Sequence, residues 1–233
     1  MKIIAFVPAR GGSQGIKKKN LILLNKKPLI KYTLETIKKI RKLVYPFIST
    51  DNLEILRYCK SQGFKMSYLR PKSLSRNKSN VVDAFLHGVD WINKNKKIKF
   101  DTVLLLQPTS PLREISEIKK AIKIFKNKRL ESLASVIKMR ESPFECIEKK
   151  NNKWIYLKKP LKNTFRRQQF NKNFYFIDGS FYIAKIDFIK RYKTFFNNKI
   201  TQPFILNRTW PIDIDEKDDL LVAKAFITKR QKV

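Results

Sequence analysis

Three of the six glycines of the chain lie within five residues, at Gly11, Gly12 and Gly15. They follow directly after the apolar run of residues 2–7 and Pro8. Glycine permits backbone angles that are closed to other residues and lets a ligand approach the chain closely. Successive backbone N–H groups of such a turn can point inward and bind an anion. The pattern therefore predicts a loop that could hold a triphosphate.

Polar and basic side chains surround this loop. Asn20 could both donate and accept hydrogen bonds, and phosphate charge could be neutralised by Arg10, Ser13, Lys17, Lys18 and Lys19. The spacing matches neither the dinucleotide-binding glycine pattern nor the Walker pattern, which argues against hydride transfer and ATP hydrolysis. A tight turn that holds no ligand is the alternative interpretation of the loop.

A pair of carboxylates lies near the other end of the chain. Asp213 and Asp215 alternate across Ile214, so in extended backbone both side chains point to one face. Carboxylate oxygens are the ligands of hard divalent cations, which makes this pair a predicted Mg²⁺ site. The alternative is an exposed acidic turn at the start of a helix predicted over 216–229, because acidic residues favour helix N-termini.

The elements that must position these residues alternate between apolar strands and amphipathic helices. The predicted strands are 2–7, 44–49, 64–69 and 101–106, and the predicted helices are 28–40, 52–62, 80–93 and 114–127. This rhythm indicates an α/β fold with a Rossmann-like parallel sheet flanked by helices, whose ligands lie beyond the carboxyl ends of the strands.

The rhythm changes after about residue 133, where strand-like segments follow one another without long helices. We predict a single domain over 1–233 that carries a strand-rich lobe or arm at about 133–186. The edges of such a lobe need covering, which favours association with a second copy.

Seven segments resemble, in order along the chain, the motifs of the acylneuraminate cytidylyltransferases, or CMP-sialic acid synthetases. They are VPARGGSQGIKKKN at 7–20, KPLIKYTLE at 27–35, STD at 49–51, RPKSLSRNKS at 70–79, LLLQPTSPLR at 104–113, FRRQ at 165–168 and IDID at 212–215. Several collinear matches are more specific than any one short motif. The resemblance implies a sheet of the nucleotide-diphospho-sugar transferase type, an extended dimerisation arm and a homodimer.

The resemblance also implies the roles of individual residues. CTP would be bound by Arg10, Gly11, Gly12, Ser13, Gln14, Gly15, Lys19, Asn20, Arg70 and Ser79. The acidic sugar would meet Gln107, Arg166 and Tyr182, and Mg²⁺ would be held by Asp213 and Asp215. The catalytic set would be Arg10, Lys19, Gln107, Asp213 and Asp215.

Two positions depart from the family pattern. Gln14 stands where many members carry Lys, which removes one positive charge beside the triphosphate, and Arg10 with Lys17 to Lys19 could compensate. Asn77 replaces a frequent Asp of the segment at 70–79.

The implied reaction joins CMP from CTP to a nine-carbon acidic sugar and releases diphosphate. The anomeric hydroxyl of the sugar attacks the α-phosphorus, so no nucleophilic side chain is needed, and the protein positions the reactants and neutralises charge. N-acylneuraminate is the expected sugar, and legionaminate and pseudaminate are the alternatives. 3-Deoxy-octulosonate is less favoured by the FRRQ and STD segments. A surface polysaccharide or another surface glycan is the expected destination of the product.

The formal net charge of +33 arises from 52 Lys and Arg against 19 Asp and Glu. Such a field attracts polyanions, so a non-catalytic basic protein that binds nucleotides or nucleic acid is the alternative from a different class. No basic-aromatic module or zinc-type spacing accompanies the charge, and we therefore expect no specific nucleic-acid partner.

Cys59 and Cys146 are too few and too far apart for a disulfide scaffold, which favours a reducing compartment. The apolar run at 3–7 is too short for a signal peptide or a membrane span. We expect a cytoplasmic protein with no membrane partner.

Overall fold

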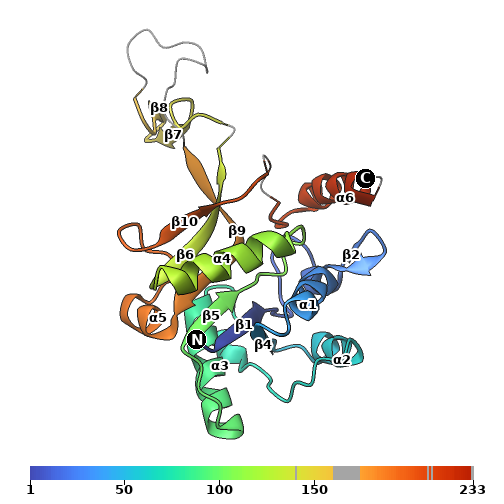
Figure 1. Cartoon of the computed structure of the whole chain (residues 1–233). Coiled ribbons are helices and arrows are strands. Elements are labelled where there is room, and N and C mark those ends of the chain that lie inside the picture. Colours follow the sequence, from blue (N-terminus) through green and yellow to red (C-terminus); the bar gives the residue numbers. More distant parts are fainter. Residues whose placement is uncertain (140, 160–173, 209, 211, 232–233) are drawn as a thin grey trace.

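A six-stranded sheet forms the centre of the molecule in a computed structural model that describes residues 1–139, 141–159, 174–208, 210 and 212–231. The strand order is β10-β6-β9-β5-β1-β4 (Figure 1). The strands are β1 Ile3–Pro8, β4 Val44–Ser49, β5 Thr102–Leu105, β6 Ser132–Lys138, β9 Tyr175–Lys185 and β10 Gln202–Ile205. Strand β9 runs antiparallel to both of its neighbours, whereas the other pairs are parallel.

Six α-helices accompany this sheet within the described ranges. They are α1 Leu29–Lys39, α2 Leu53–Ser61, α3 Val81–Lys96, α4 Ile115–Asn127, α5 Ile186–Tyr192 and α6 Lys217–Gln231. Asparagine side chains set two of the helix starts: Asn52 accepts from backbone N–H groups at the start of α2, and Asn80 does so at the start of α3.

The direction of winding reverses at β1. The chain passes from β1 through α1 to β4 on one side, and then returns through α2 and α3 to β5 on the other side. Because such crossovers are right-handed, helices on outward and return paths cover opposite faces of the sheet. The reversal leaves a crevice beyond the carboxyl ends of β1 and β5, which is where ligands bind in folds of this kind.

A buried apolar core explains why β1 can lie in the middle of the sheet. Its residues Ile3 to Val7 are at most 4% exposed, as expected of a parallel strand covered on both faces. A second, smaller apolar cluster joins distant parts of the chain. It contains Ile16 beside the glycine loop, Ile212 and Ile214 around the predicted metal ligands, and Ala223 of α6. This cluster holds the two predicted ligand-binding segments against each other.

The segment 64–69 is not a strand, and the prediction for it was wrong. Its side chains do alternate, with Phe64, Met66 and Tyr68 buried and the residues between them exposed, which is the pattern that suggested a strand. Strand β4 is the edge of the sheet and has Pro46 at its centre. Proline has no N–H to donate to a further strand, so it is characteristic of sheet edges.

The predicted lobe at about 133–186 divides into two parts. Strands β6 and β9 belong to the central sheet, and the short hairpin of β7 Ile147–Lys150 and β8 Lys153–Tyr156 stands away from the body (Figure 1). Every residue of the two hairpin strands is exposed. We call this hairpin the arm. A second small hairpin pairs β2 Leu23–Leu24 with β3 Lys27–Pro28 next to α6.

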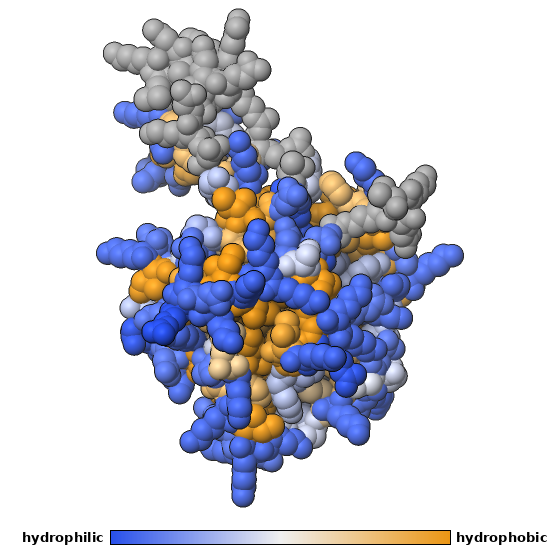
Figure 2. Space-filling model, viewed as in Figure 1, coloured by the Kyte–Doolittle hydropathy of each residue, from blue (hydrophilic) through white to orange (hydrophobic). Residues whose placement is uncertain are grey.

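Hydrophilic side chains cover most of the face shown in Figure 2, and hydrophobic ones show through between them. The 52 Lys and Arg residues are spread along the whole sequence rather than gathered in one segment. Within the described ranges, none of the helices combines the length and the apolar character that a membrane crossing requires.

Candidate active site

A cleft of about 310 Å³ lies beyond the carboxyl ends of β1 and β5. Its walls come from the glycine loop, the segment at 70–81, the turn after β5 and the segment before α6. The predicted site residues that line it are Arg10, Gly12, Ser13, Lys19, Asn20, Arg70, Ser79, Gln107, Asp213 and Asp215. Residues more than 200 positions apart in the sequence thus meet in one cleft.

The glycine loop is anchored by an acidic side chain at the end of β4. The backbone N–H of Gly11 donates to Asp51 Oδ1 at 2.8 Å, so this N–H already holds a carboxylate. Gly15 lies so close to the segment before α6 that an added Cβ would come within 2.4 Å of the Asp215 carbonyl oxygen and 2.6 Å of Glu216 Oε1. The glycine loop is therefore in direct contact with the segment at 212–215, which we call the carboxylate segment.

Arg10 is held by hydrogen bonds to the segment at 70–81. Its Nη1 donates to the Arg76 carbonyl at 3.0 Å and to Asn77 Oδ1 at 3.4 Å, while Asn20 Nδ2 donates to the Arg10 carbonyl at 2.8 Å. The amide of Asn77 thus supplies an acceptor to Arg10 at the position where Asp was expected. Since Nη2 and Nε of Arg10 are not used in these bonds, the guanidinium keeps donors for an anion in the cleft.

Lys19 reaches into the carboxylate segment. Its Nζ lies 2.7 Å from Asp215 Oδ1 and donates to the Ile214 carbonyl at 2.9 Å. The Lys19 side chain is 13% exposed, whereas that of Asp215 is 70% exposed. The Ile214 N–H donates to the Thr109 carbonyl at 2.8 Å, which ties the segment to the turn after β5.

The alternation predicted around Ile214 is present: Ile212 and Ile214 are buried, and Asp213 and Asp215 face the cleft. Protein atoms around the Asp213 carboxylate displace water and so raise its pKa, and the nearby charge of Asp215 raises it further. A hydrogen bond from Thr109 and the positive charges of Lys19 and Arg113 oppose this rise in pKa. Two neighbouring carboxylates of like charge are an arrangement that a cation relieves.

This pair fits a hard divalent cation, because both ligands are oxygens and an ammonium already sits on Asp215. In the parts of the chain that the structure describes, no set of three or more His, Cys, Asp and Glu side chains is placed to hold a metal ion. In the described part of the chain, this pair of carboxylates is therefore what the cleft offers to such an ion.

A buried network of charged side chains lies behind the cleft, and it was not predicted from the sequence. Arg113 donates to the Gln107 carbonyl, the Ser180 carbonyl and Thr33 Oγ1, and so joins the turn after β5 to β9 and α1. Burial lowers the pKa of Arg113 to about 9, and the charge of Arg208 lowers it as well. Arg113 nevertheless stays protonated at neutral pH.

Asp178 is the acidic centre of this network. Its carboxylate is buried and accepts hydrogen bonds from Ser135, Ser180 and Arg208. The next residue, Gly179, has a φ of +71°, and a Cβ there would lie 3.5 Å from Asp213 Oδ2 and 3.6 Å from Gln107 Oε1. The network therefore fixes the floor on which Gln107 and Asp213 sit. A DG dipeptide inside an otherwise apolar strand was the one local signal for it.

A family model described as cytidylyltransferase matches residues 4–230 of the chain. That range contains the glycine loop, the turn after β5 and the carboxylate segment, which are the three segments that meet in the cleft. The chain belongs to the cytidylyltransferase family. The family therefore agrees with the resemblance seen in the sequence motifs.

Relatives of this cytidylyltransferase carry names that refer to acidic sugars. The CMP-N,N'-diacetyllegionaminic acid synthase of Legionella pneumophila is 32% identical over 100% of this chain and 99% of its own length. The N-acylneuraminate cytidylyltransferase of Escherichia coli is 28% identical, and the match covers 100% of this chain but 54% of the relative. The solved structure of a CMP:2-keto-3-deoxy-manno-octonic acid synthetase complexed with CTP has a TM-score of 0.73, covers 99% of this chain and 100% of that one, and shares 15% identity, which shows the likeness of fold.

Four predicted residues do not line the cleft of this cytidylyltransferase in the described part of the chain. Gly11, Gln14 and Gly15 belong to the glycine loop itself, where Gly11 binds Asp51 and Gly15 packs on the carboxylate segment. Tyr182 is in β9 opposite Leu105 and packs on Phe195. Burial raises the pKa of Tyr182 to about 12. Arg166 lies outside the described residues.

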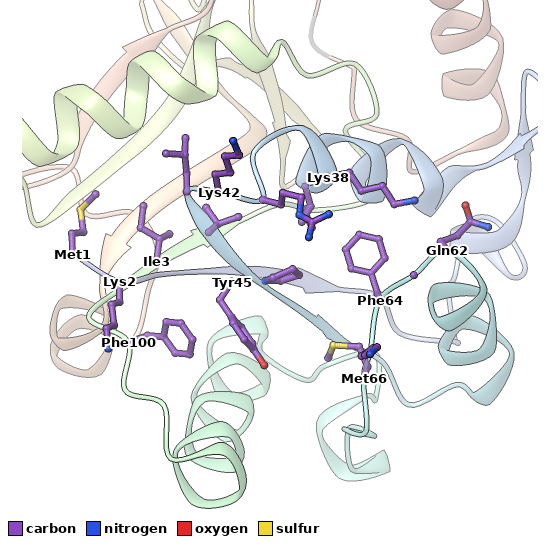
Figure 3. Close-up of a pocket in the computed structure, with 17 residues that line it drawn as sticks. Met1, Lys2, Ile3, Lys38, Lys42, Tyr45, Gln62, Phe64, Met66 and Phe100 are labelled. Atoms are coloured by element: carbon purple, nitrogen blue, oxygen red, sulfur yellow. The ribbon is translucent and has the colours of Figure 1, made fainter.

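A larger groove of about 1050 Å³ lies at the amino ends of β1 and β4, at the opposite end of these strands (Figure 3). Its lining residues include the aromatic Tyr45, Phe64 and Phe100 and the basic Lys38 and Lys42 (Figure 3). Its described lining contains no Asp, Glu, His or Cys. Despite its size, the groove offers no carboxylate, imidazole or thiolate in its described lining to bind a metal ion, so we assign the chemistry to the smaller cleft.

Proposed function

We propose that this cytidylyltransferase transfers CMP from CTP to a nine-carbon acidic sugar and releases diphosphate. The observation that carries the proposal is the meeting of a glycine loop, Arg10, Lys19 and the pair Asp213 and Asp215 in one cleft. Phosphoryl transfer needs positioning and charge neutralisation more than covalent chemistry, and this cleft offers both.

The triphosphate lies along the glycine loop in this proposal. Gly12 and Ser13 line the cleft, and Arg10 and Lys19 supply positive charge to it. Arg70 and Ser79 stand on the wall formed by the segment at 70–81. Arg70 is itself fixed, because its guanidinium donates to the Ser49 hydroxyl and carbonyl at the end of β4. These residues hold the nucleotide so that its α-phosphorus faces the carboxylate segment.

Asp213 and Asp215 hold Mg²⁺ in this proposal. When bound, the ion would neutralise charge on the phosphate oxygens and so ease attack at phosphorus. The described residues supply the two carboxylates, and the Lys19 ammonium beside them would bind phosphate.

The sugar enters over Gln107, which faces the cleft next to Asp213. Its anomeric hydroxyl oxygen forms a bond to the α-phosphorus, the bond from that phosphorus to the bridging oxygen breaks, and diphosphate leaves with the electron pair. The hydroxyl proton passes to solvent. Arg166 and Tyr182 remain predicted contacts of the sugar, and the carboxylate of the substrate suits the basic surroundings.

Three related sugars are candidates for the substrate, and observations favour two of them. The sequence motifs favour N-acylneuraminate. One relative that matches over 99% of its own length is named for N,N'-diacetyllegionaminic acid, and that observation favours the second candidate. Both are nine-carbon acidic sugars, so the proposed chemistry is the same for either. Pseudaminate remains the third candidate.

The test is release of diphosphate from CTP with Mg²⁺ across a panel of N-acetylneuraminate, N,N'-diacetyllegionaminate, pseudaminate and 3-deoxy-octulosonate. We expect release with one nine-carbon sugar, no release without sugar, and little release when ATP replaces CTP. Release at equal rates with and without sugar, or with ATP as well as CTP, would contradict the proposal.

We also propose that the protein works as a homodimer through the arm, in the cytoplasm where CTP is made. Trp154, Ile155 and Tyr156 are 65%, 41% and 55% exposed on a two-stranded hairpin, a structure that is marginal in water by itself. A second copy would cover them. We expect Trp154→Glu to sediment as a monomer, and Leu53→Glu, a control at an exposed leucine of α2, to sediment as the wild type does. A monomeric wild-type protein at tens of micromolar would overturn this proposal.

A further inference from the structure

Lys19 occupies the position beside Asp215 that a cation would take. Its Nζ has two acceptors there, Asp215 Oδ1 at 2.7 Å and the Ile214 carbonyl at 2.9 Å. The contact joins residues 196 positions apart, and the Lys19 side chain is largely buried at 13% exposure. The ammonium is thus fixed in place at the carboxylate segment instead of pointing into solvent.

The same ammonium has a second possible place. Lys19 lines the cleft together with Arg10, Gly12 and Ser13, where the phosphates of a nucleotide would lie. A lysine ammonium has three donors on a flexible stem, so it can turn from one set of acceptors to another nearby. A triphosphate carries more negative charge than a single carboxylate and would draw it toward the loop.

The carboxylate pair is also incomplete without a nucleotide. The described residues provide two carboxylates and no third acidic, histidine or cysteine ligand. Mg²⁺ usually takes one or two carboxylates and completes its shell with water and substrate phosphates. Both observations have the same consequence. The carboxylate pair has a low affinity for a divalent cation while Lys19 contacts Asp215 and no phosphates are present.

We infer that Lys19 acts as a resident counter-ion of Asp215, which excludes the divalent cation until the triphosphate draws the ammonium to the glycine loop. The inference rests on the proposed function for its metal pair, and it adds an order of events: the cation binds with the nucleotide and not before it. A free enzyme would then spend little time loaded with metal but without substrate.

The experiment measures Mn²⁺ binding to the nucleotide-free protein by electron paramagnetic resonance, with wild type, Lys19→Gln and Lys18→Gln. Lys18 is the matched control, because it is the adjacent residue, loses the same charge, and pairs with Glu54 at 2.9 Å rather than with the carboxylate segment. We expect Lys19→Gln to bind Mn²⁺ about tenfold more tightly than wild type, since a positive charge has left Asp215. Lys18→Gln should match wild type.

A double variant, Lys19→Gln with Asp215→Asn, should lose the gain, and thermal unfolding of each variant checks that the fold is kept. Equal Mn²⁺ affinities for wild type, Lys18→Gln and Lys19→Gln would overturn the inference. A gain of the same size in both single variants would also overturn it, because it would reflect net charge alone. Sugar-dependent diphosphate release with no change in Mn²⁺ affinity would refute this inference and leave the proposed function standing. A gain in Mn²⁺ affinity in Lys19→Gln alone, without sugar-dependent diphosphate release by the wild type, would refute the proposed function and not this inference.

Discussion

The two ends of strand β1 open into two very different hollows. The groove at its amino end has about 1050 Å³ and is lined by aromatic and basic side chains, whereas the cleft at its carboxyl end has about 310 Å³ and holds both signs of charge. The difference follows from topology. Loops that leave the carboxyl ends of β1, β4 and β5 converge where the winding reverses, and they bring chemistry-bearing residues together. Volume therefore predicts the site less well than the strand ends do.

The largest effect should come from the carboxylate pair of the cleft. We expect Asp215→Ala to reduce sugar-dependent diphosphate release by about 10³-fold, because charge stabilisation at the reacting phosphate is lost. Asp218→Ala, an exposed carboxylate in the first turn of α6, is the matched control and should stay within about threefold of wild type. Full activity of Asp215→Ala with an intact fold would show that the cleft is not the catalytic site.

The network behind the cleft should dominate stability. Arg113→Met leaves the Gln107 and Ser180 carbonyls without their donor, and we expect the free energy of unfolding in urea to fall by about 3 kcal/mol. The control Arg57→Met removes an exposed arginine of α2 and should cost under about 0.5 kcal/mol. Equal stabilities of the two variants would mean that the buried arginine contributes nothing to the floor of the cleft.

The contact between the glycine loop and the carboxylate segment should give a smaller effect. A Cβ at residue 15 would come within 2.4 Å of the Asp215 carbonyl oxygen, so Gly15→Ala must displace Asp215. We expect turnover to fall by up to about 10²-fold, as for other small misplacements of reacting groups. Gly12→Ala, whose Cβ meets nothing within 4 Å, should keep the thermal midpoint of wild type. Unchanged turnover in Gly15→Ala would show that the two segments move independently.

The groove at the amino end should give the smallest effect. Lys42→Glu reverses the charge of an exposed side chain there, and we expect the kcat and KM for CTP to stay within about twofold of wild type. A larger change in either constant would show that the two ends of the sheet communicate, and the comparison drawn above would fail.

Much of the cleft could be predicted because its parts are local in the sequence. The glycine loop, the alternation around Ile214 and the apolar strands are patterns of a few residues, and periodicity reveals them. The network of Arg113, Asp178 and Arg208 could not be predicted in this way. Its members are 30 to 95 positions apart, and their charges are compensated in space and not along the chain.

The error at 64–69 has a related cause. Alternation of buried and exposed side chains reports that one side of an extended segment is covered, but it does not report whether a neighbour offers backbone hydrogen bonds. The edge of the sheet is β4, and its central Pro46 has no N–H to donate to a further strand. Which strand lies at the edge is decided by the folded structure, so the local sequence pattern could not reveal it.

The two outermost strands of the central sheet share a feature that bears on how this protein behaves at high concentration. Strand β4 contains Pro46, and strand β10, which has four residues, contains Pro203. An open sheet edge can recruit a strand from another molecule and start aggregation, and proline or shortness at the edge prevents this. A chain rich in apolar, aromatic strand sequence thereby remains protected at both margins of its sheet against growth into fibrous assemblies.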